Sequence, residues 1–428
     1  MGRTIALAKV LGALALAGGG ATILAYCTLY GPDLVPEIEA GSGIGFWSGA
    51  YDAGGQTCFS AGEPTPAERP AAGDTSEVSP IYLAVGTMRI GSQDANFQPD
   101  AGAWEDLGFD LDGVCTNSPT CTQDDPTVSC KPTVAAIPYD GNYCRDNTFG
   151  KLEVQAASIP EVGGKYGLND DAFNCALCTG AYNFVMKLSH YNGGANDDSV
   201  RVDLYPSPGL VSVLPWSCTD PSWRVHPCFT ADMPWYIRDT AVTQDAGGPN
   251  LPDAVLSDPN AYVKDGYVVA QLPTDTLFWF PTIAGRKSDV ATAFPLKFTQ
   301  AVVAGHVTKA EDGTWSIVDG TIAGRSRESD IIEGFRLIGF CDSDPNYTLM
   351  QGFLHGSLDI LASGQNDPNA TCDSVSVGIA FTARQATPGP LIHVDDLVEC
   401  ALGDGGADAG ADGSTDAGAD ATNDATGD

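Results

Sequence analysis

The sequence is poor in positive charge. Its 428 residues include 21 Lys or Arg against 55 Asp or Glu, which gives a formal net charge of −34. Binding to nucleic acid needs patches of Lys and Arg that displace counterions from phosphates, and docking on anionic lipid needs similar patches. The composition therefore excludes a nucleic-acid partner and argues against electrostatic docking on a membrane. It favours solubility and tolerance of divalent cations.

Familiar catalytic motifs are also missing. The chain has no GxSxG, HExxH, Walker or GxGxxG motif. Its five histidines are scattered and nominate no nucleophile. A carboxylate pair for glycoside cleavage cannot be chosen from so many acids by sequence spacing alone. We therefore expect a non-catalytic binding or structural module, with a hydrolase built on unrecognised carboxylates as an alternative.

Long apolar runs are confined to the N-terminus. Arg3 and Lys9 give a basic start, and the sixteen residues from Val10 to Ala25 carry no charge. This pattern is typical of a signal peptide, which we assign to residues 1–26. The uncharged run reaches 21 residues if it is counted to Tyr30, which is enough to span a bilayer. We expect an exported protein in the outer membrane, the periplasm or the extracellular space.

The signal ends in the letters LAYC, which resemble a bacterial lipobox whose cysteine becomes acylated. Leu24 and Ala25 match that pattern, whereas Tyr26 stands where a small residue is usual. Three outcomes stay open: lipid attachment at Cys27, a secretory signal cleaved elsewhere, and an uncleaved membrane anchor.

Cysteine usage indicates an oxidising compartment, because cytosolic thiols are normally kept reduced. The chain has thirteen cysteines, so an even number remains when Cys27 is set aside. We expect all the others to form disulfides: Cys58, Cys115, Cys121, Cys130, Cys144, Cys175, Cys178, Cys218, Cys228, Cys341, Cys372 and Cys400. The Cys175-x-x-Cys178 spacing is expected to serve two structural disulfides in a loop, with a zinc site or a redox pair as alternatives. Spacing around a late helix predicts a Cys341–Cys372 bond.

Composition divides the rest of the chain into three parts. Residues 27–45 are rich in Pro, Gly and acids without periodicity, which is typical of a tether. Residues 46–400 form one β-rich, disulfide-bonded domain. Residues 401–428 place Asp at every fourth position from 404 and offer no core after Leu402, so we expect a disordered acidic tail. A loose interaction of this tail with divalent ions or a partner is the alternative.

Within the domain, alternating apolar residues predict many short strands. In SVRVDLYPS, Val200, Val202 and Leu204 point to one side, which predicts a strand buried on one face only. This strand is expected to pair with NFVMKLSH, and Asp265-Gly266 and Asp312-Gly313 are expected to form type I′ hairpin turns. Short strands with frequent Gly and Pro turns favour a β-sandwich or jelly roll over a barrel.

Two short helices are expected near the C-terminal end. The stretch SDIIEGFRLIG has an apolar stripe, and Ser329 is expected to cap its first turn. The stretch TLMQGFLHGSLDILASG has a wide apolar face, and Gly364 is expected to end it. His355 and Asp359 lie one turn apart on this second helix and are expected to form an exposed pair.

Acidic loops between residues 110 and 146 suggest a cation site. Asp110, Asp112, Asp140 and Asp146 lie near Cys115 and Cys144, and calcium favours such carboxylate-rich loops. The DLDG stretch lacks the first Asp and the final Glu of an EF-hand loop. The alternative is that these acids are solvated and form turns through their own backbone. Calcium is the one cofactor that the sequence suggests.

Aromatic residues gather between residues 216 and 236. Trp216, Trp223, Trp235 and Tyr236 surround Cys218 and Cys228. Exposed rings on a loop could stack on a sugar, so a carbohydrate-binding protein, dependent on calcium or not, is an alternative function. The competing interpretation is that buried rings hold a long loop in place, and a protein partner is then the alternative to a glycan.

Four pieces of the chain, LGFDLDGVCT, CRDNTFGKL, YNGGANDDSVRVDLY and CDSVSVGIAFTA, precede a tail rich in Asp, Ala and Gly. Together they resemble a set of uncharacterised bacterial cell-envelope lipoproteins with such tails. The resemblance covers most of residues 46–400. It implies export and a single β-rich unit, and it implies no activity and no functional residue.

Overall fold

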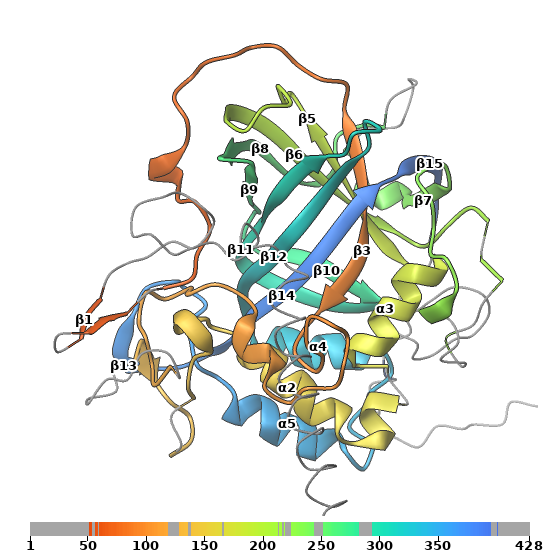
Figure 1. The fold of residues 1–428 in the computed structure, drawn as a ribbon. Helices are drawn as coiled ribbons and strands as arrows, with labels where there is room; N and C mark the ends of the chain where they lie inside the picture. Colours follow the sequence, from red (N-terminus) through yellow and green to blue (C-terminus); the bar gives the residue numbers. More distant parts are fainter. Residues whose placement is uncertain are drawn as a thin grey trace, which may run out of the picture.

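The computed structural model describes residues 51–53, 56–58, 60–118, 128–135, 138–164, 167–212, 214–215, 218, 224–243, 251–281, 293–394 and 400 (Figure 1). The predicted signal peptide, the tether, Cys27 and the acidic tail all lie outside these residues. Among the described residues, no helix has both the length and the apolar character needed to cross a bilayer.

The core of the fold is an antiparallel β-barrel (Figure 1). Its strands follow one another around the barrel in chain order, and the pairing of β14 with β3 closes the ring. The eight strands are β3 (Ile81–Arg89), β5 (Asn183–Ser189), β6 (Asp197–Ser207), β8 (Leu256–Lys264), β9 (Tyr267–Gln271), β11 (Ala293–Lys309), β12 (Trp315–Arg327) and β14 (Ser374–Gln385). A further strand, β10 (Thr276–Pro281), pairs with the first part of β11, whereas β9 pairs with its second part.

The expected mainly β fold with disulfides is confirmed, but the expected sandwich or jelly roll is wrong, because the sheet closes into a barrel. Alternating apolar residues fill the inside of a barrel as well as they fill the space between two sheets, so the pattern does not distinguish them. The barrel is filled by side chains such as Leu83, Met186, Val202 and Ile379, all of which are buried in one cluster. An eight-stranded barrel is just wide enough to be filled in this way.

The predicted hairpins are present. β5 and β6 pair across residues 190–196, and β8 and β9 pair across Asp265 and Gly266. Both of these turn residues have positive φ, 50° and 86°, as a type I′ turn requires. β11 and β12 also form a hairpin, but only Gly313 of the predicted pair has positive φ, so this turn is not of type I′.

Four α-helices among the described residues gather at one end of the barrel (Figure 1). They are α2 (Thr148–Ala157), α3 (Asp170–Thr179), α4 (Glu328–Leu337) and α5 (Tyr347–Gly356). Phe173 of α3, Phe335 of α4 and Met350 of α5 join the same apolar cluster as the barrel interior. The sequence predicted α4 and α5 but missed α2 and α3, whose N-terminal ends are capped by Asn147 and Asn169.

Because of tertiary contacts, the start of α4 and the end of α5 differ from those predicted from the sequence. Ser329 does not cap α4; the helix begins at Glu328, whose backbone N–H donates to the carbonyl of Asp373 on another segment. α5 ends at Gly356 rather than at Gly364. Beyond it, the N–H groups of residues 359 and 360 donate to the carbonyl of Ser374, the first residue of β14, so the chain leaves the helix there.

Short paired strands lie outside the barrel. β1 (Tyr51–Ala53) pairs with β2 (Gln56–Cys58), β4 (Cys130–Lys131) pairs with β13 (Asp367–Thr371), and β7 (Pro234–Arg238) pairs with β15 (Thr387–Ile392). Single turns of 3₁₀ helix are Pro66–Glu68, Ala103–Asp106, Asn142–Cys144 and Asp239–Ala241, and Pro160–Gly164 forms one π turn. The β7–β15 pair packs Trp235 and Ile237 against the outer face of the barrel, next to Val185 and Tyr205.

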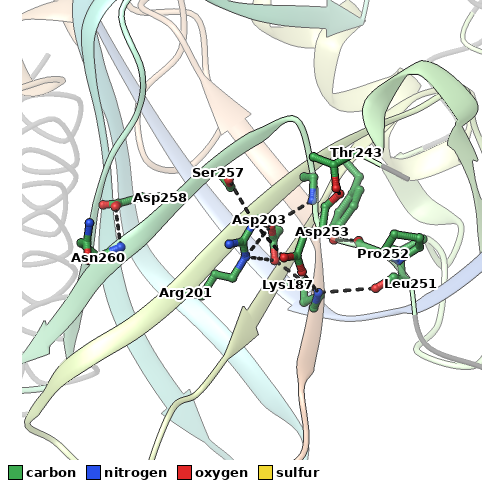
Figure 2. Close-up of polar contacts among 12 residues, drawn as sticks. Lys187, Arg201, Asp203, Thr243, Leu251, Pro252, Asp253, Ser257, Asp258 and Asn260 are labelled. Atoms are coloured by element: carbon green, nitrogen blue, oxygen red, sulfur yellow. Dashed lines mark hydrogen bonds and ion pairs between the residues drawn. The ribbon is translucent and has the colours of Figure 1, made fainter. Parts of the chain in front are cut away.

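The outer face of β5 and β6 also carries a buried ion-pair network (Figure 2). Lys187 of β5 lies directly opposite Asp203 of β6, and their charged atoms are 3.3 Å apart. Asp203 is fully buried and also accepts hydrogen bonds from the Arg201 guanidinium and from the backbone N–H of Ala254. The predicted one-sided burial of β6 is therefore wrong, because the segment that includes residues 251–254 covers its outer face.

Five disulfides are described, which supports an oxidising compartment. They are Cys115–Cys144, Cys130–Cys372, Cys175–Cys218, Cys178–Cys228 and Cys341–Cys400. The predicted Cys341–Cys372 bond is wrong, because the pairing of β13 with β4 brings Cys372 to Cys130, and Cys341 bonds to Cys400. Cys175 and Cys178 do serve two structural bonds, although from α3 rather than from a loop. Cys121 and the side chain of Cys58 lie outside the described residues.

Candidate functional site

Three of the four predicted calcium ligands come together. Asp110 and Asp112 lie on the loop that follows Ala103–Asp106, and Asp146 lies two residues before α2. One carboxylate oxygen from each of these residues lies within 4.8 Å of the other two. We call these three residues the aspartate cluster. Asp146 lies 34 and 36 residues after Asp112 and Asp110 in the sequence, so the fold had to bring the two segments together.

Backbone hydrogen bonds shape the loop around Asp146. Its own N–H donates to the carbonyl of Phe109 at 2.9 Å, and its Oδ2 accepts from the N–H groups of Leu111 and Asp112 at 2.6 and 3.3 Å. The side chain is almost wholly buried. A buried carboxylate that the backbone holds in place keeps further lone pairs with which it can coordinate a cation.

The other two aspartates are held by their own turns. Asp110 accepts from the N–H of Gly113 at 2.7 Å and from the hydroxyl of Ser60 at 2.5 Å. Asp112 accepts from the N–H of Val114 at 2.8 Å. These are the turn-forming contacts that the sequence offered as an alternative to calcium. Because each carboxylate has further lone pairs, the turns and a cation site are compatible.

Burial and repulsion between carboxylates raise pKa values in the aspartate cluster. Burial raises the pKa of Asp112, and burial together with the neighbouring Asp112 and Asp140 raises the pKa of Asp146 well above its ordinary value. Arg325 of β12 faces these carboxylates, but its guanidinium donates to the side chain of Gln300 and to the carbonyl of Leu111. The carboxylates therefore hold more negative charge than the nearby arginine balances.

Asp140, the fourth predicted ligand, lies near the cluster without joining it. Its carboxylate accepts from the N–H of Thr116, and burial followed by repulsion from Asp112 raises its pKa well above the ordinary value. The structure thus places Asp140 in the same electrostatic neighbourhood, where it adds to the negative charge around the aspartate cluster.

Asp359 is a site residue that the sequence did not identify. It was expected to pair with His355 on a helix, but α5 ends before it, and His355 contacts Glu328 instead. The buried Asp359 carboxylate accepts from the hydroxyl of Thr148 and from the N–H and hydroxyl of Ser376, and burial raises its pKa to about 6. No local sequence signal could reveal this position, since Asp359 is more than 200 residues from Asp146.

Two disulfides brace the surroundings of the cluster. Cys115–Cys144 joins the segment just after Asp112 to the segment just before Asp146. Cys130–Cys372 links β4 to the residue pair before β14, over a sequence separation of 242. Because Cys115–Cys144 links the two segments that carry the ligands, it restricts how far the carboxylates can move apart.

The predicted aromatic binding surface does not form as expected. Trp235 is fully buried and packs edge-on against Phe229, with ring centroids 4.9 Å apart, so it cannot stack on a sugar. Tyr236 is partly exposed, and Trp216 and Trp223 lie outside the described residues. Cys218 and Cys228 do not bridge to each other but attach this region to α3. For Trp235, the alternative of a buried ring that holds a long loop is therefore correct.

Comparison of the chain with protein-family models, curated proteins and solved structures found no match.

Proposed function

We propose that the chain is an exported, non-catalytic binding module of the cell envelope whose aspartate cluster holds a calcium ion. The observation that carries this proposal is the convergence of Asp110, Asp112 and Asp146 next to Arg325, whose one positive charge does not balance three carboxylates. The cation would join the loop at residues 109–114 to the start of α2, and so to the end of the barrel where the helices gather. It would thereby order a surface for a protein or glycan partner.

The distances within the cluster fit calcium. Calcium binds six to eight oxygens at about 2.3–2.6 Å, so two ligands on opposite sides of one ion lie at most about 5 Å apart. The cluster oxygens all lie within 4.8 Å of one another. Carbonyl groups and water molecules complete such a coordination shell in flexible acidic loops.

The charges support the same proposal. Carboxylates in a buried environment must take up protons or a cation, because an isolated buried charge is costly. The raised pKa values of Asp112, Asp140 and Asp146 mean that these carboxylates take up protons more readily in the protein without metal. A divalent cation would neutralise their charge instead at neutral pH.

A hydrolase is less well supported. Two catalytic carboxyls need to face a substrate from opposite sides with room between them. The three cluster carboxylates instead accept hydrogen bonds from the backbone and side chains of their own and neighbouring loops. This arrangement favours a structural cation over bound substrate.

Calcium titration of the purified exported protein tests the proposal. Extracellular modules bind calcium with dissociation constants on the order of 10⁻⁴–10⁻³ M. At one hundred times the dissociation constant, binding stabilises the folded state by about 2.7 kcal/mol. For a domain of this size, we expect the melting temperature to rise by roughly 5 °C over that in chelator. Isothermal titration calorimetry should give one site.

Asp146→Asn should abolish the calcium-induced shift, because it removes charge from the buried ligand and keeps its shape. The matched control is Asp319→Asn, which changes an exposed aspartate on β12 and should retain the full shift. The absence of any calcium-dependent shift or heat in the wild-type protein would refute the proposed cation site, as would an equal shift in both variants.

Export and anchoring are tested separately. We propose that residues 1–26 are removed and that Cys27 is acylated, as its LAYC context suggests. Intact mass of the native protein, with and without reductant, reports the cleavage point, the acyl chains and the number of disulfides. A mass that corresponds to cleavage at another residue without acyl chains would contradict lipid attachment. A full-length mass would favour an uncleaved anchor.

A further inference from the structure

A groove between α2 and α5 has the size of a small-molecule site. Its volume is about 190 Å³. A cavity of about 150 Å³ accepts a guest as large as a benzene ring, so this groove has room for one six-membered ring. The two helices lie beside each other below the barrel (Figure 1) and contact each other directly. The lining residues are Pro138, Thr148, Lys151, Gln155, Gly352, Phe353, Gly356 and Ser357.

Two glycines keep the groove open. Gly352 lies within α5, and a Cβ added there would meet no atom within 4 Å, so neither crowding nor a positive φ requires glycine. A Cβ added at Gly356, one turn further along α5, would meet only the Cγ1 atom of Val134, at 4.0 Å. Glycine is a poorer helix former than alanine. The sequence thus has glycine, a poor helix former, at two helix positions where a larger side chain would fill the groove.

The polar atoms of the groove favour a ligand that carries hydroxyl groups. The side-chain oxygen Oε1 of Gln155 is buried and has no hydrogen-bond partner among the described residues. The hydroxyls of the lining residues Thr148 and Ser357 already donate, to Asp359 and to the carbonyl of Phe353, so each oxygen can act towards a ligand only as an acceptor. An unpartnered buried acceptor is costly, and a ligand that donates hydrogen bonds would remove that cost.

The charges around the groove favour a neutral ligand. Lys151 lies with its ammonium group 4.2 Å from the centroid of the Tyr139 ring, and it already interacts with the carboxylates of Asp359 and Glu105. A cationic ligand would be repelled by Lys151, and the nearby charges of Asp359 and Glu105, which do not line the groove, offset the attraction of Lys151 for an anionic ligand. A neutral molecule that carries several hydroxyls and one less polar face fits both conditions, with Phe353 and Pro138 as the apolar wall.

We propose that the groove between α2 and α5 binds a single neutral hexose unit, as a free sugar or as the end of a glycan. Gln155 Oε1 accepts from one sugar hydroxyl, Lys151 donates to another, and Phe353 packs on the ring. This site is distinct from the predicted aromatic surface at residues 216–236. It also does not depend on calcium at the aspartate cluster, so each proposal can fail without the other.

Saturation-transfer NMR with the full exported protein tests this site. The probes are glucose, galactose, mannose and N-acetylglucosamine at millimolar concentration, and at least one of them should receive saturation from the wild-type protein. Gly352→Leu should abolish the signal, because leucine retains the helix but fills the groove. Leu349→Gln changes an exposed residue of the same helix and should leave the signal intact.

Two further variants separate binding from folding. Gly352→Ala should raise the melting temperature by roughly 2 °C while weakening the sugar signal, because it improves helix propensity and narrows the groove. Gln155→Leu adds no volume at the glycines and should reduce affinity at least tenfold. Absence of signal from all four sugars would overturn the proposal. A signal that persists in both Gly352→Leu and Gln155→Leu would place binding elsewhere and would also overturn it.

Discussion

The buried network around Asp203 allows a demanding test of the fold, through the variant Asp203→Ala. The Asp203 carboxylate is fully buried and contacts Lys187 at 3.3 Å and Arg201 at 2.9 Å (Figure 2). Its removal leaves the ammonium group of Lys187, whose side chain is only 8% exposed, without its buried partner. It also removes the acceptor for the N–H of Ala254, which lies 3.0 Å away.

The expected cost follows from these contacts. Removing one partner of a buried ion pair lowers the free energy of unfolding by about 3–5 kcal/mol, because the other charge stays buried without a partner. Asp253 lies 3.4 Å from Lys187 but is half exposed, so it compensates only in part. We therefore expect Asp203→Ala to lower the free energy of unfolding by about 3–4 kcal/mol. Asp203→Asn should cost less, since its amide oxygen still accepts from Ala254.

Denaturant unfolding with the disulfides intact measures this cost. The control is Asp239→Ala, which removes an exposed carboxylate paired with His393 and should cost no more than about 1 kcal/mol. The double variant Lys187→Met with Asp203→Leu should recover much of the loss, because apolar side chains often replace a buried ion pair at little cost. A loss below about 1 kcal/mol for Asp203→Ala would refute the reasoning.

Three further predictions concern other parts of the fold. Asp170→Ala should cost about 3 kcal/mol and speed amide exchange at residues 90–93, because the Asp170 carboxylate accepts four backbone N–H groups there. Gly320→Ala should cost about 1–3 kcal/mol in denaturant unfolding, since a Cβ would lie 2.6 Å from the Phe381 ring. The metal-free protein should become more stable as the pH falls from 7 towards 5. Burial raises the pKa of Asp359 to about 6, so its charged form is penalised in the folded state above that pH, by about 3 kcal/mol relative to an ordinary aspartate. This penalty fades as the carboxyl takes up a proton, and Asp359→Asn should remove that part of the pH dependence.

Several features could be predicted from the sequence because they depend on neighbouring residues. Alternation gave the strands at residues 183–189 and 197–207, and Asp265-Gly266 gave its turn, since only a few residue types tolerate positive φ. The apolar stripes gave α4 and α5. The density of acids between Asp110 and Asp146 indicated the region of the candidate cation site. The number of cysteines outside the signal predicted disulfides and an oxidising compartment.

The tertiary structure decided what depends on contacts between distant segments. Closure into a barrel requires β14 to meet β3 across the whole domain, and local alternation is the same in a sandwich. The pairing of Cys372 with Cys130, the entry of Asp359 and Arg325 into the surroundings of the aspartate cluster, and the burial of Trp235 all follow from that closure. A pattern of single residues carries the preference of each segment for a strand or a helix, whereas partners are chosen only when the whole core is assembled.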